Sequence, residues 1–215
     1  KPENEFMPTN HRDRAENSNE LPFGRLPKHQ CEQIHAASLQ ILERTGVRLY
    51  HQEAIDLLQK AGAEVSEGNR IRIPRNVVET ALRTVPNEFT LYNRNGQASM
   101  RLRAALNYYG PGSDCMSIID HRTGQRRLPT LEDVRNGVRL CDALEIIDFV
   151  MSLFLPCDVD YRMTDRFQML VMLSETIKPS LYVTNDFQGC VDALEMAEVV
   201  VGGERAFREK PIAAG

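Results

Sequence analysis

The sequence predicts an α/β protein in two parts, an N-terminal α+β module over residues 27–145 and the start of a parallel β-sheet over residues 146–215. Near-continuous apolar runs over residues 148–154 and 179–184 are typical of strands buried on both faces. Helical patterns separate these runs, and a third run begins at residue 210. Strands that alternate with helices form parallel sheets through right-handed crossovers. Periodicity does not separate a doubly wound sheet from a (β/α)8 barrel.

The composition indicates a chain that can bury a core of its own. Of 215 residues, 42% are hydrophobic, and acidic and basic residues are mixed to give a formal net charge of −4. Phosphate binding usually shows as a basic stripe, so we expect no nucleic-acid partner. The longest apolar runs are too short to span a bilayer, so we expect no membrane association. Residues 1–26 begin with a stretch that is nearly devoid of apolar side chains, and we expect them to form a flexible arm.

The N-terminal module is predicted to alternate short helices with hairpins. Apolar residues recur at helical spacing over residues 34–45, 54–61 and 74–85. A glycine or a proline directly follows each of these patterns and is expected to end the helix. Ser66–Asn69 is typical of a hairpin turn. Residues 89–92 alternate like a strand, and Asn95-Gly96 is a strong signal for a type I′ turn to a partner strand near Met100.

A further hairpin and a helix complete the module. Residues 116–119 and 125–128 are predicted to pair across the turn Asp120–Gly124. Asp120 and His121 could suggest a base and its orienting group, but turn chemistry explains them more simply. Thr130 and Asp133 have the spacing of a capping box at a helix start, in which the threonine hydroxyl accepts from the Asp133 amide.

The stretch Asn107–Cys115 joins the two parts of the chain. Two tyrosines run into Gly110-Pro111-Gly112, and Asp114 follows. Glycine permits close approach of the backbone, and proline stiffens the turn. Two interpretations stay open: a hairpin corner with packed rings, or a loop that contacts a substrate or partner. No histidine lies nearby in sequence to activate Cys115, and the glycine patterns of phosphate-binding loops are absent.

The five cysteines are odd in number and widely spaced, with no Cys-x-x-Cys pair. The pattern predicts neither a zinc site nor a disulfide scaffold, so no metal site is expected. Free thiols in a reducing cytoplasm are the simplest interpretation. The sequence stops within its third apolar run, and an unpaired strand would leave an open sheet edge. We therefore expect this chain to be the N-terminal part of a longer protein.

A series of short blocks occurs in one order from about residue 28 to the end of the chain. The blocks are Ile34–Leu39, Glu43–Val47, Leu57–Ala63, Arg70–Pro74, Phe89–Tyr92, Tyr109–Asp114, Asp120–Gly124, Leu140–Leu144 and Ile147–Val150. In these blocks the sequence resembles the trimethylamine methyltransferase family, the substrate:corrinoid methyltransferases that include glycine betaine relatives without pyrrolysine. So many blocks in one order are specific for the family and not for the substrate.

The resemblance implies a (β/α)8 TIM barrel, of which about three strands are present here, preceded by a helical and hairpin segment. It also implies transfer of a methyl group from a methylated amine, of the trimethylamine or glycine betaine type, to the cobalt of a corrinoid. A partner protein carries that corrinoid (cobalamin), so this chain is expected to bind no cofactor directly. The pyrrolysine of the trimethylamine-specific members would lie beyond residue 215.

The implied substrate suggests candidate binding residues. Aromatic faces and carboxylates hold a quaternary ammonium, and barrel active sites lie at the C-terminal ends of the strands. The candidates are Tyr108, Tyr109, Asp114, Asp158, Asp160 and Asn185. Alternatives stay open, because carboxylates such as Asp158 and Asp160 also favour helix N-termini, and Asn185 or Asp186 could be a cap. The sequence indicates no specific catalytic residue.

Two other hypotheses about function remain. The chain could belong to a non-catalytic relative that binds a methylated amine or a corrinoid protein without turnover. It could also be a structural module of a larger protein. An incomplete barrel exposes apolar surface, so we expect self-association into a homo-oligomer, and no turnover from residues 1–215 alone.

Overall fold

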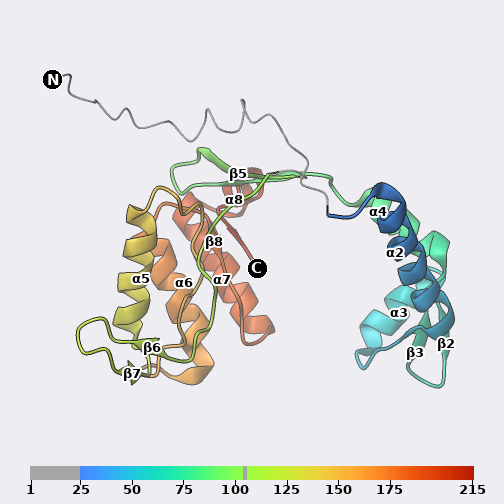
Figure 1. Cartoon of the computed structure of the whole chain (residues 1–215), viewed down its shortest axis with the longest axis horizontal. Coiled ribbons are helices and arrows are strands. Elements are labelled where there is room, and N and C mark those ends of the chain that lie inside the picture. Colours follow the sequence, from blue (N-terminus) through green and yellow to red (C-terminus); the bar gives the residue numbers. More distant parts are fainter. Residues whose placement is uncertain (1–24, 104–105) are drawn as a thin grey trace. The chain divides into compact units, whose positions relative to one another are not determined.

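The computed structural model describes residues 25–103 and 106–215, which form two compact units (Figure 1). The first unit ends at Asn87, and the second runs from Glu88 to Gly215. The predicted arm lies outside the described residues up to residue 24. The predicted division after residue 145 stays a prediction. None of the described helices is long and apolar enough to cross a membrane.

In its described residues, the first unit packs three helices with a small antiparallel sheet. Its elements are α2 (Lys28–Gln40), the π-helical turn η1 (Ile41–Thr45), β1 (Val47–Arg48), α3 (Gln52–Lys60), β2 (Glu64–Ser66), β3 (Arg70–Arg72) and α4 (Arg75–Thr84). Strand β3 is central, with Val47 of β1 and Val65 of β2 opposite Ile71. Ile71 is fully buried and packs with Ile55 and Ala63. The predicted helices and the hairpin are confirmed.

The apolar stripe that runs through α2 and η1 is largely exposed. Ile34 and Ile41 are 56% and 59% exposed, whereas Leu39 is the buried residue of the helix. Strands of two or three residues offer too little surface to cover a helix face of this length. The sequence pattern therefore predicted the helix correctly and its burial only in part.

Replacing Gly46 with alanine is expected to destabilise the first unit by about 2 kcal/mol. Gly46 ends η1 with a φ of +70°, and an added Cβ would lie 2.3 Å from the carbonyl oxygen of Ile71. Gly68 is the matched control, because its φ is +76° and an added Cβ would meet no atom within 4 Å. Hydrogen exchange of the β3 amides measures the effect. Equal losses in the two variants would contradict the close contact with Ile71.

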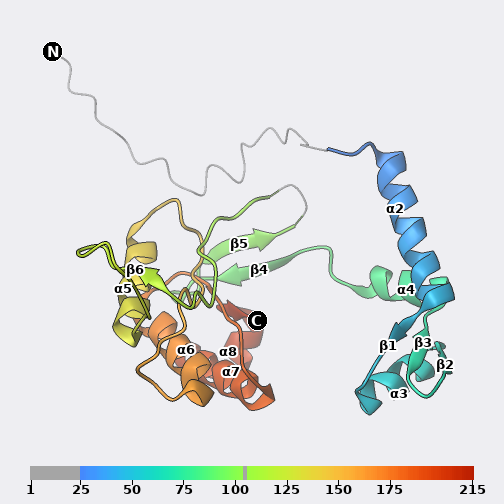
Figure 2. The ribbon, with the colours of Figure 1, turned by 60° about the horizontal axis from the view of Figure 1, so that its bottom comes forward.

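The second unit places three long helices side by side along short parallel segments (Figures 1 and 2). Its strands are β4 (Phe89–Tyr92), β5 (Ala98–Leu102), β6 (Ile118–Ile119), β7 (Arg126–Arg127), β8 (Ser180–Leu181) and β9 (Ala213–Ala214). Its helices are α5 (Leu131–Ala143), the 3-10 turn η2 (Tyr161–Met163), α6 (Thr164–Glu175), α7 (Phe187–Val201) and α8 (Glu204–Glu209). The mixed α/β class is therefore confirmed.

Four chain segments line up in parallel. Cys115 bridges Phe154, Val150 bridges Ser180, and Ser180 pairs with Ala213. The order of the segments is their order in the chain, and α5, α6 and α7 separate successive segments. The sequence predicted the last three segments. The first, around Cys115, was expected only as a connection between two parts.

The second parallel segment is more irregular than the predicted strand over residues 148–154. Leu153 has a φ of +59°, and the amide of Phe154 donates to the carbonyl of Ser152 at 2.7 Å. This i to i+2 bond closes a γ-turn, which interrupts the extended backbone. Pairing is reduced to single bridges at Val150 and Phe154 as a result.

The β4–β5 hairpin is confirmed, but the predicted type I′ turn is wrong. A type I′ turn needs a positive φ at both central residues, and in the described chain Gly96 has one (+73°) whereas Asn95 does not. The side chain of Asn93 instead accepts from the amides of Asn95 and Gln97, which widens the loop. The hairpin meets the amino ends of the parallel segments, where the Tyr92 amide donates to the carbonyl of Pro211.

The core of the second unit lies between the parallel segments and the three long helices. Each element contributes fully or almost fully buried side chains. They include Val134 and Val138 of α5, Val150, Met169 and Met172 of α6, Ala193 and Ala197 of α7, and Ile212. This packing fixes the ends of the parallel segments, and with them the loops that carry the candidate residues.

Candidate functional site at the carboxyl ends of the parallel segments

The carboxyl ends of three parallel segments carry most of the candidate residues. Asp114 directly precedes the Cys115 bridge, Asp158 and Asp160 follow the second segment, and Asn185 follows β8. Parallel strands end at the same edge of a sheet, so these residues belong to one edge. Among the described residues, no group of three or more His, Cys, Asp and Glu side chains could hold a metal ion.

Asp114 is held in an unusual backbone conformation. Its φ is +58°, which aspartate tolerates better than most residues do. The hydroxyl of Ser152, which is 1% exposed, donates to Oδ1 of Asp114 at 3.0 Å. The other carboxylate oxygen takes no hydrogen bond from the described residues, and no described lysine or arginine pairs with it. No described cation therefore lies in an ion pair with Asp114 at this edge.

Asp158 and Asp160 differ in their electrostatic partners. Asp158 is exposed, and its Oδ1 accepts from the amide of Leu131 at 2.8 Å, at the N-terminus of α5. No described cation pairs with it. Asp160 caps η2 through the amide of Arg162 and forms an ion pair with that residue at 2.7 Å. These contacts with Arg162 lower the pKa of Asp160 to about 2. Both aspartates therefore have the helix-terminal role that was the alternative interpretation.

Asn185 belongs to a network that anchors the loops of this edge. Its amide donates to Oδ2 of the buried Asp165 at 2.9 Å, and its side chain donates to the carbonyl of Tyr161. Arg166, whose side chain is 11% exposed, forms ion pairs with Asp165, with Asp186 at 3.0 Å and with Asp192. The expected cap is confirmed at Asp186, which accepts from the amide of Gly189.

Sequence reasoning missed the Arg166 network. Its members come from η2, α6 and α7 and the loop before α7, and no local pattern links them. The signal that was available is an aspartate followed by an arginine at the start of a helix otherwise rich in apolar residues. A charged pair at such positions, Asp165 and Arg166, needs partners when the helix packs on both sides.

The two candidate tyrosines lie toward the amino ends of the same segments. The hydroxyl of Tyr108 accepts from the Arg101 amide at 2.8 Å and donates to the Arg101 carbonyl, so the β5 strand holds it. The Tyr109 amide donates to Oδ2 of Asp148, and the Asp148 amide donates to the Tyr109 carbonyl. Asp148 begins the second segment, six residues before Phe154. The candidate aspartates and Asn185 therefore lie on the carboxyl edge, and the two tyrosines do not.

The β6–β7 hairpin, residues 116–128, follows the first segment at the carboxyl edge. Arg127 bridges Asp120 of its turn at 2.9 Å and Asp133 of α5 at 2.6 Å. The predicted capping box at Thr130 and Asp133 is confirmed. Hydrogen bonds from Arg127 and from the amides of Thr123 and Arg122 lower the pKa of Asp120 to about 2. The pKa of Asp133 is also lowered, first by Arg127.

These ion pairs predict a defined loss of stability in acid. The folded pKa of Asp120 lies below its ordinary value, so its stabilisation is complete above pH 3.8 and disappears as the pH falls toward about 2. In Asp120→Asn this contribution is absent. We expect the urea midpoints of the wild type and the variant to differ at pH 6 and to converge as the pH falls to about 2. A constant difference across this range would contradict the assigned ion pair.

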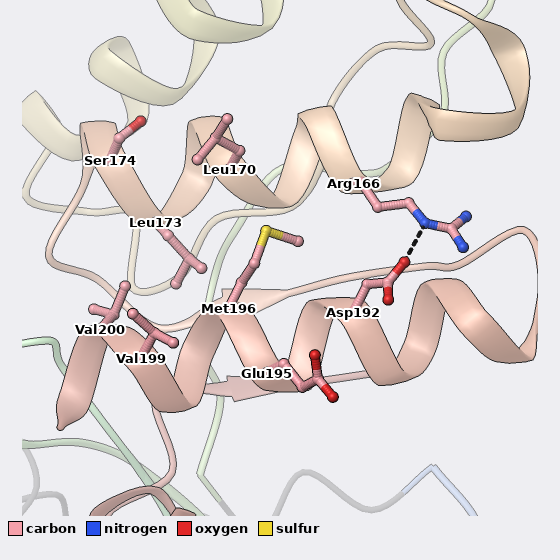
Figure 3. Close-up of a pocket in the computed structure, with 9 residues that line it drawn as sticks. All are labelled: Arg166, Leu170, Leu173, Ser174, Asp192, Glu195, Met196, Val199 and Val200. Carbon is pink, nitrogen blue, oxygen red and sulfur yellow. Dashed lines mark hydrogen bonds and ion pairs between the residues drawn. The ribbon is translucent and has the colours of Figure 1, made fainter. Parts of the chain in front are cut away.

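A groove of about 620 Å³ lies between α6 and α7, and none of these candidate residues lines it (Figure 3). Its walls are mainly apolar, and the pair formed by Arg166 and Asp192 lies at one end. Val199 and Val200 lie at the other end. Of the charged residues that line the groove, Arg166 and Asp192 pair with each other, and Glu195 has no described ion-pair partner. We assign no reaction to it.

Comparison with known proteins identifies the family. The profile of the family described as trimethylamine methyltransferase (MTTB) matches residues 8–215. The chain belongs to this family. It is 31% identical over 183 residues to trimethylamine methyltransferase MttB of Desulfitobacterium hafniense (strain DSM 10664 / DCB-2), which covers 83% of this chain and 36% of that protein.

Two further relatives widen the range of named substrates. Glycine betaine methyltransferase of Desulfitobacterium hafniense (strain Y51) is 28% identical over 87% of this chain and 39% of its own length. Proline betaine:corrinoid methyltransferase of Eubacterium limosum is 27% identical over 69% of this chain and 31% of its own length. The chain thus spans less than two fifths of the length of each of these relatives.

Proposed function

We propose that the protein containing this chain transfers a methyl group from a methylated amine to a corrinoid carried by a partner protein. The single observation that carries the proposal is the family match over residues 8–215. The relatives are named for trimethylamine, glycine betaine and proline betaine, and one name includes the corrinoid. All three named amines are methylated at nitrogen, and we infer the same substrate class here.

We further propose that the four parallel segments are the first part of a (β/α)8 barrel. Neighbouring segments are consecutive in the chain, and a helix connects each pair. A barrel requires this order, whereas a doubly wound sheet reverses its strand order at a switch point. Barrel enzymes bind their substrates at the carboxyl ends of the strands. The carboxyl edge of these segments is therefore our proposed site.

The charges of that edge support a cationic substrate. Arginines already neutralise Asp160, Asp165 and Asp186, whereas no described cation pairs with Asp114 or Asp158. A quaternary ammonium has no N–H to donate, so it is recognised by charge and by apolar or aromatic contacts. We propose that Asp114 supplies negative charge beside the ammonium and that Ser152 fixes its carboxylate.

The protein needs no general base for such a transfer. The amine leaves as a neutral tertiary or secondary amine, and the corrinoid supplies the methyl acceptor when it is present. The contribution of this chain is to bind and orient the amine, because alignment of the reacting atoms is the main requirement of a displacement reaction. The Arg166 network serves this role indirectly, since it fixes the loops around Asn185.

Cobalt spectroscopy tests the proposal. The complete protein is incubated with reduced corrinoid protein and with trimethylamine, glycine betaine or proline betaine in turn, and the Co(I) absorbance is followed. We expect Co(I) to be replaced by methyl–cobalt with at least one methylated amine. No methyl–cobalt with any of these amines, under conditions in which a characterised relative reacts, would refute the proposed function.

A further inference from the structure

The outer face of the β6–β7 hairpin combines exposed apolar side chains with positive charge. In the observed register, Ile118 pairs with Arg127 and Ile119 with Arg126, so Ile119 and Arg126 share one face. Side chains alternate between the faces of a strand, which places Leu128 on that face as well. Ile119 is 66% exposed and Leu128 is 61% exposed. Ile118 and Arg127, on the other face, are partly buried.

The hairpin is rigidly attached to the second unit. Arg127 binds Asp120 in the turn and Asp133 in the first turn of α5, so one guanidinium joins the hairpin to a helix. Asp120 also accepts from the amides of Arg122 and Thr123. The exposed apolar side chains are thus presented in a fixed arrangement, which lowers the entropic cost of binding a partner.

The free charge of the hairpin is positive in a chain that is acidic as a whole. Residues 116–128 contain three arginines and one carboxylate, and that carboxylate is paired with Arg127. Arg122 takes part in no described ion pair, and Arg126 donates to the hydroxyl of Ser117. The formal net charge of the chain is −4. A partner that meets this face would therefore carry acidic groups around an apolar centre.

The position of the hairpin decides which partner fits. Met116 directly follows Cys115, and Asp114 directly precedes it, so the hairpin begins at the proposed site. Methyl transfer requires the cobalt of the partner to reach the bound amine, so the protein that carries the corrinoid must contact the loops of this edge. Figure 1 shows β6 and β7 at the end of α5 that is opposite the β5 strand and α8.

From these observations we propose that the outer face of the β6–β7 hairpin, with Ile119, Arg126 and Leu128 and the turn residue Arg122, is the docking surface for an acidic corrinoid protein. This inference rests on the proposed function for the identity of the partner. It extends that function by naming the residues of this chain that contact the partner.

Binding measurements on the complete protein test the docking surface. The probe is the corrinoid protein of the source organism. Its cobalamin absorbance identifies it during purification, and its cobalt is kept in one oxidation state throughout. In Ile119→Thr and in Arg122→Glu, we expect the Kd for this protein to rise by about tenfold or more. Val199→Thr is the matched control, because Val199 is 79% exposed on α7, and its Kd should equal that of the wild type.

A second readout separates docking from chemistry. Methyl transfer to free cob(I)alamin needs no protein partner, so the hairpin variants should retain it within about twofold. An unchanged Kd in both hairpin variants would overturn the inference, and so would an equal loss of transfer to free and protein-bound cobalt. A lowered melting temperature in Ile119→Thr would also overturn it, since another part of the protein would then cover the face.

The two proposals can fail separately. If the wild type transfers no methyl group to either acceptor, the proposed function fails, and the Kd of the hairpin variants still decides whether this face binds the corrinoid protein. If transfer occurs and the hairpin variants bind normally, the proposed function stands and the docking surface is wrong.

Raising the salt concentration should weaken wild-type binding more than binding by Arg122→Glu.

Discussion

Replacing Gly189 with alanine is expected to destabilise the second unit by about 2–3 kcal/mol, although alanine favours helices over glycine by about 1 kcal/mol. Gly189 lies in the first turn of α7. An added Cβ would lie 2.2 Å from Oδ2 of Asp165 and 3.0 Å from Nη1 of Arg166. Asp165 is 5% exposed and accepts from the Asn185 amide, so its carboxylate cannot move away without losing that bond.

Urea unfolding followed by circular dichroism measures this effect, and Gly112→Ala is its control. An added Cβ at Gly112 would meet no atom within 4 Å, and the φ of this residue is not positive. Alanine there should leave the free energy of unfolding unchanged or raise it by less than about 1 kcal/mol. If Gly189→Ala were as stable as the wild type, the close approach of α7 to the Arg166 network would be wrong.

Replacing Asp114 with asparagine is expected to raise the KM for the methylated amine by about tenfold in the complete protein, with a smaller effect on kcat. Asparagine tolerates the φ of +58° at this position and keeps an oxygen that can accept from Ser152. The variant therefore removes the negative charge with little change to the backbone. Steady-state kinetics with several amine concentrations provide the measurement.

Two companion variants make the test of Asp114 specific. Asp114→Gly removes the carboxylate, so it should show the same rise in KM. Relief of the left-handed backbone offsets part of the cost of leaving the buried Ser152 hydroxyl unpaired. Asp148→Asn changes a carboxylate at the amino end of the neighbouring segment, where Oδ2 accepts from the Tyr109 amide. It should leave the KM within about twofold of the wild-type value. A larger effect at Asp148 than at Asp114 would place the substrate at the opposite edge.

Local signals in the sequence predicted elements that are stabilised locally. The capping box at Thr130 and Asp133 depends on residues three apart, and it is present as expected. The helix stop at Gly46 depends on one residue with a positive φ. Such features are determined by neighbours in the chain, so a single sequence contains the information that is needed to predict them.

Features that depend on distant residues were not predicted. The bridge between Cys115 and Phe154 joins residues 39 positions apart, and the γ-turn at Leu153 is visible only as a backbone angle. Helix α8 was missed because Gly202 and Gly203 precede it and it has only six residues. The Asn95-Gly96 dipeptide predicted a type I′ turn. The conformation of the loop is instead stabilised by the side chain of Asn93, which accepts from the Asn95 amide.

The candidate site was predicted in outline. The rule that barrel sites lie at the carboxyl ends of strands selected Asp158, Asp160 and Asn185. Asp114 was proposed from the Gly-Pro-Gly stretch, and it lies near the same edge. Sequence reasoning could not show that Arg162 already neutralises Asp160, because the two side chains meet only in the folded loop. It also grouped Tyr108 and Tyr109 with Asp114, since these residues lie within one short stretch. An extended backbone instead carries them toward opposite ends of the segment.

A structure of the complete protein with a bound methylated ammonium compound tests the central claim most directly. We expect the parallel segments described here to continue into a closed barrel. The ammonium should lie at their carboxyl ends, within contact distance of the carboxylate of Asp114 or Asp158. An ammonium bound at the amino ends, beside Tyr109 and Asp148, or in the groove between α6 and α7, would contradict the proposed site.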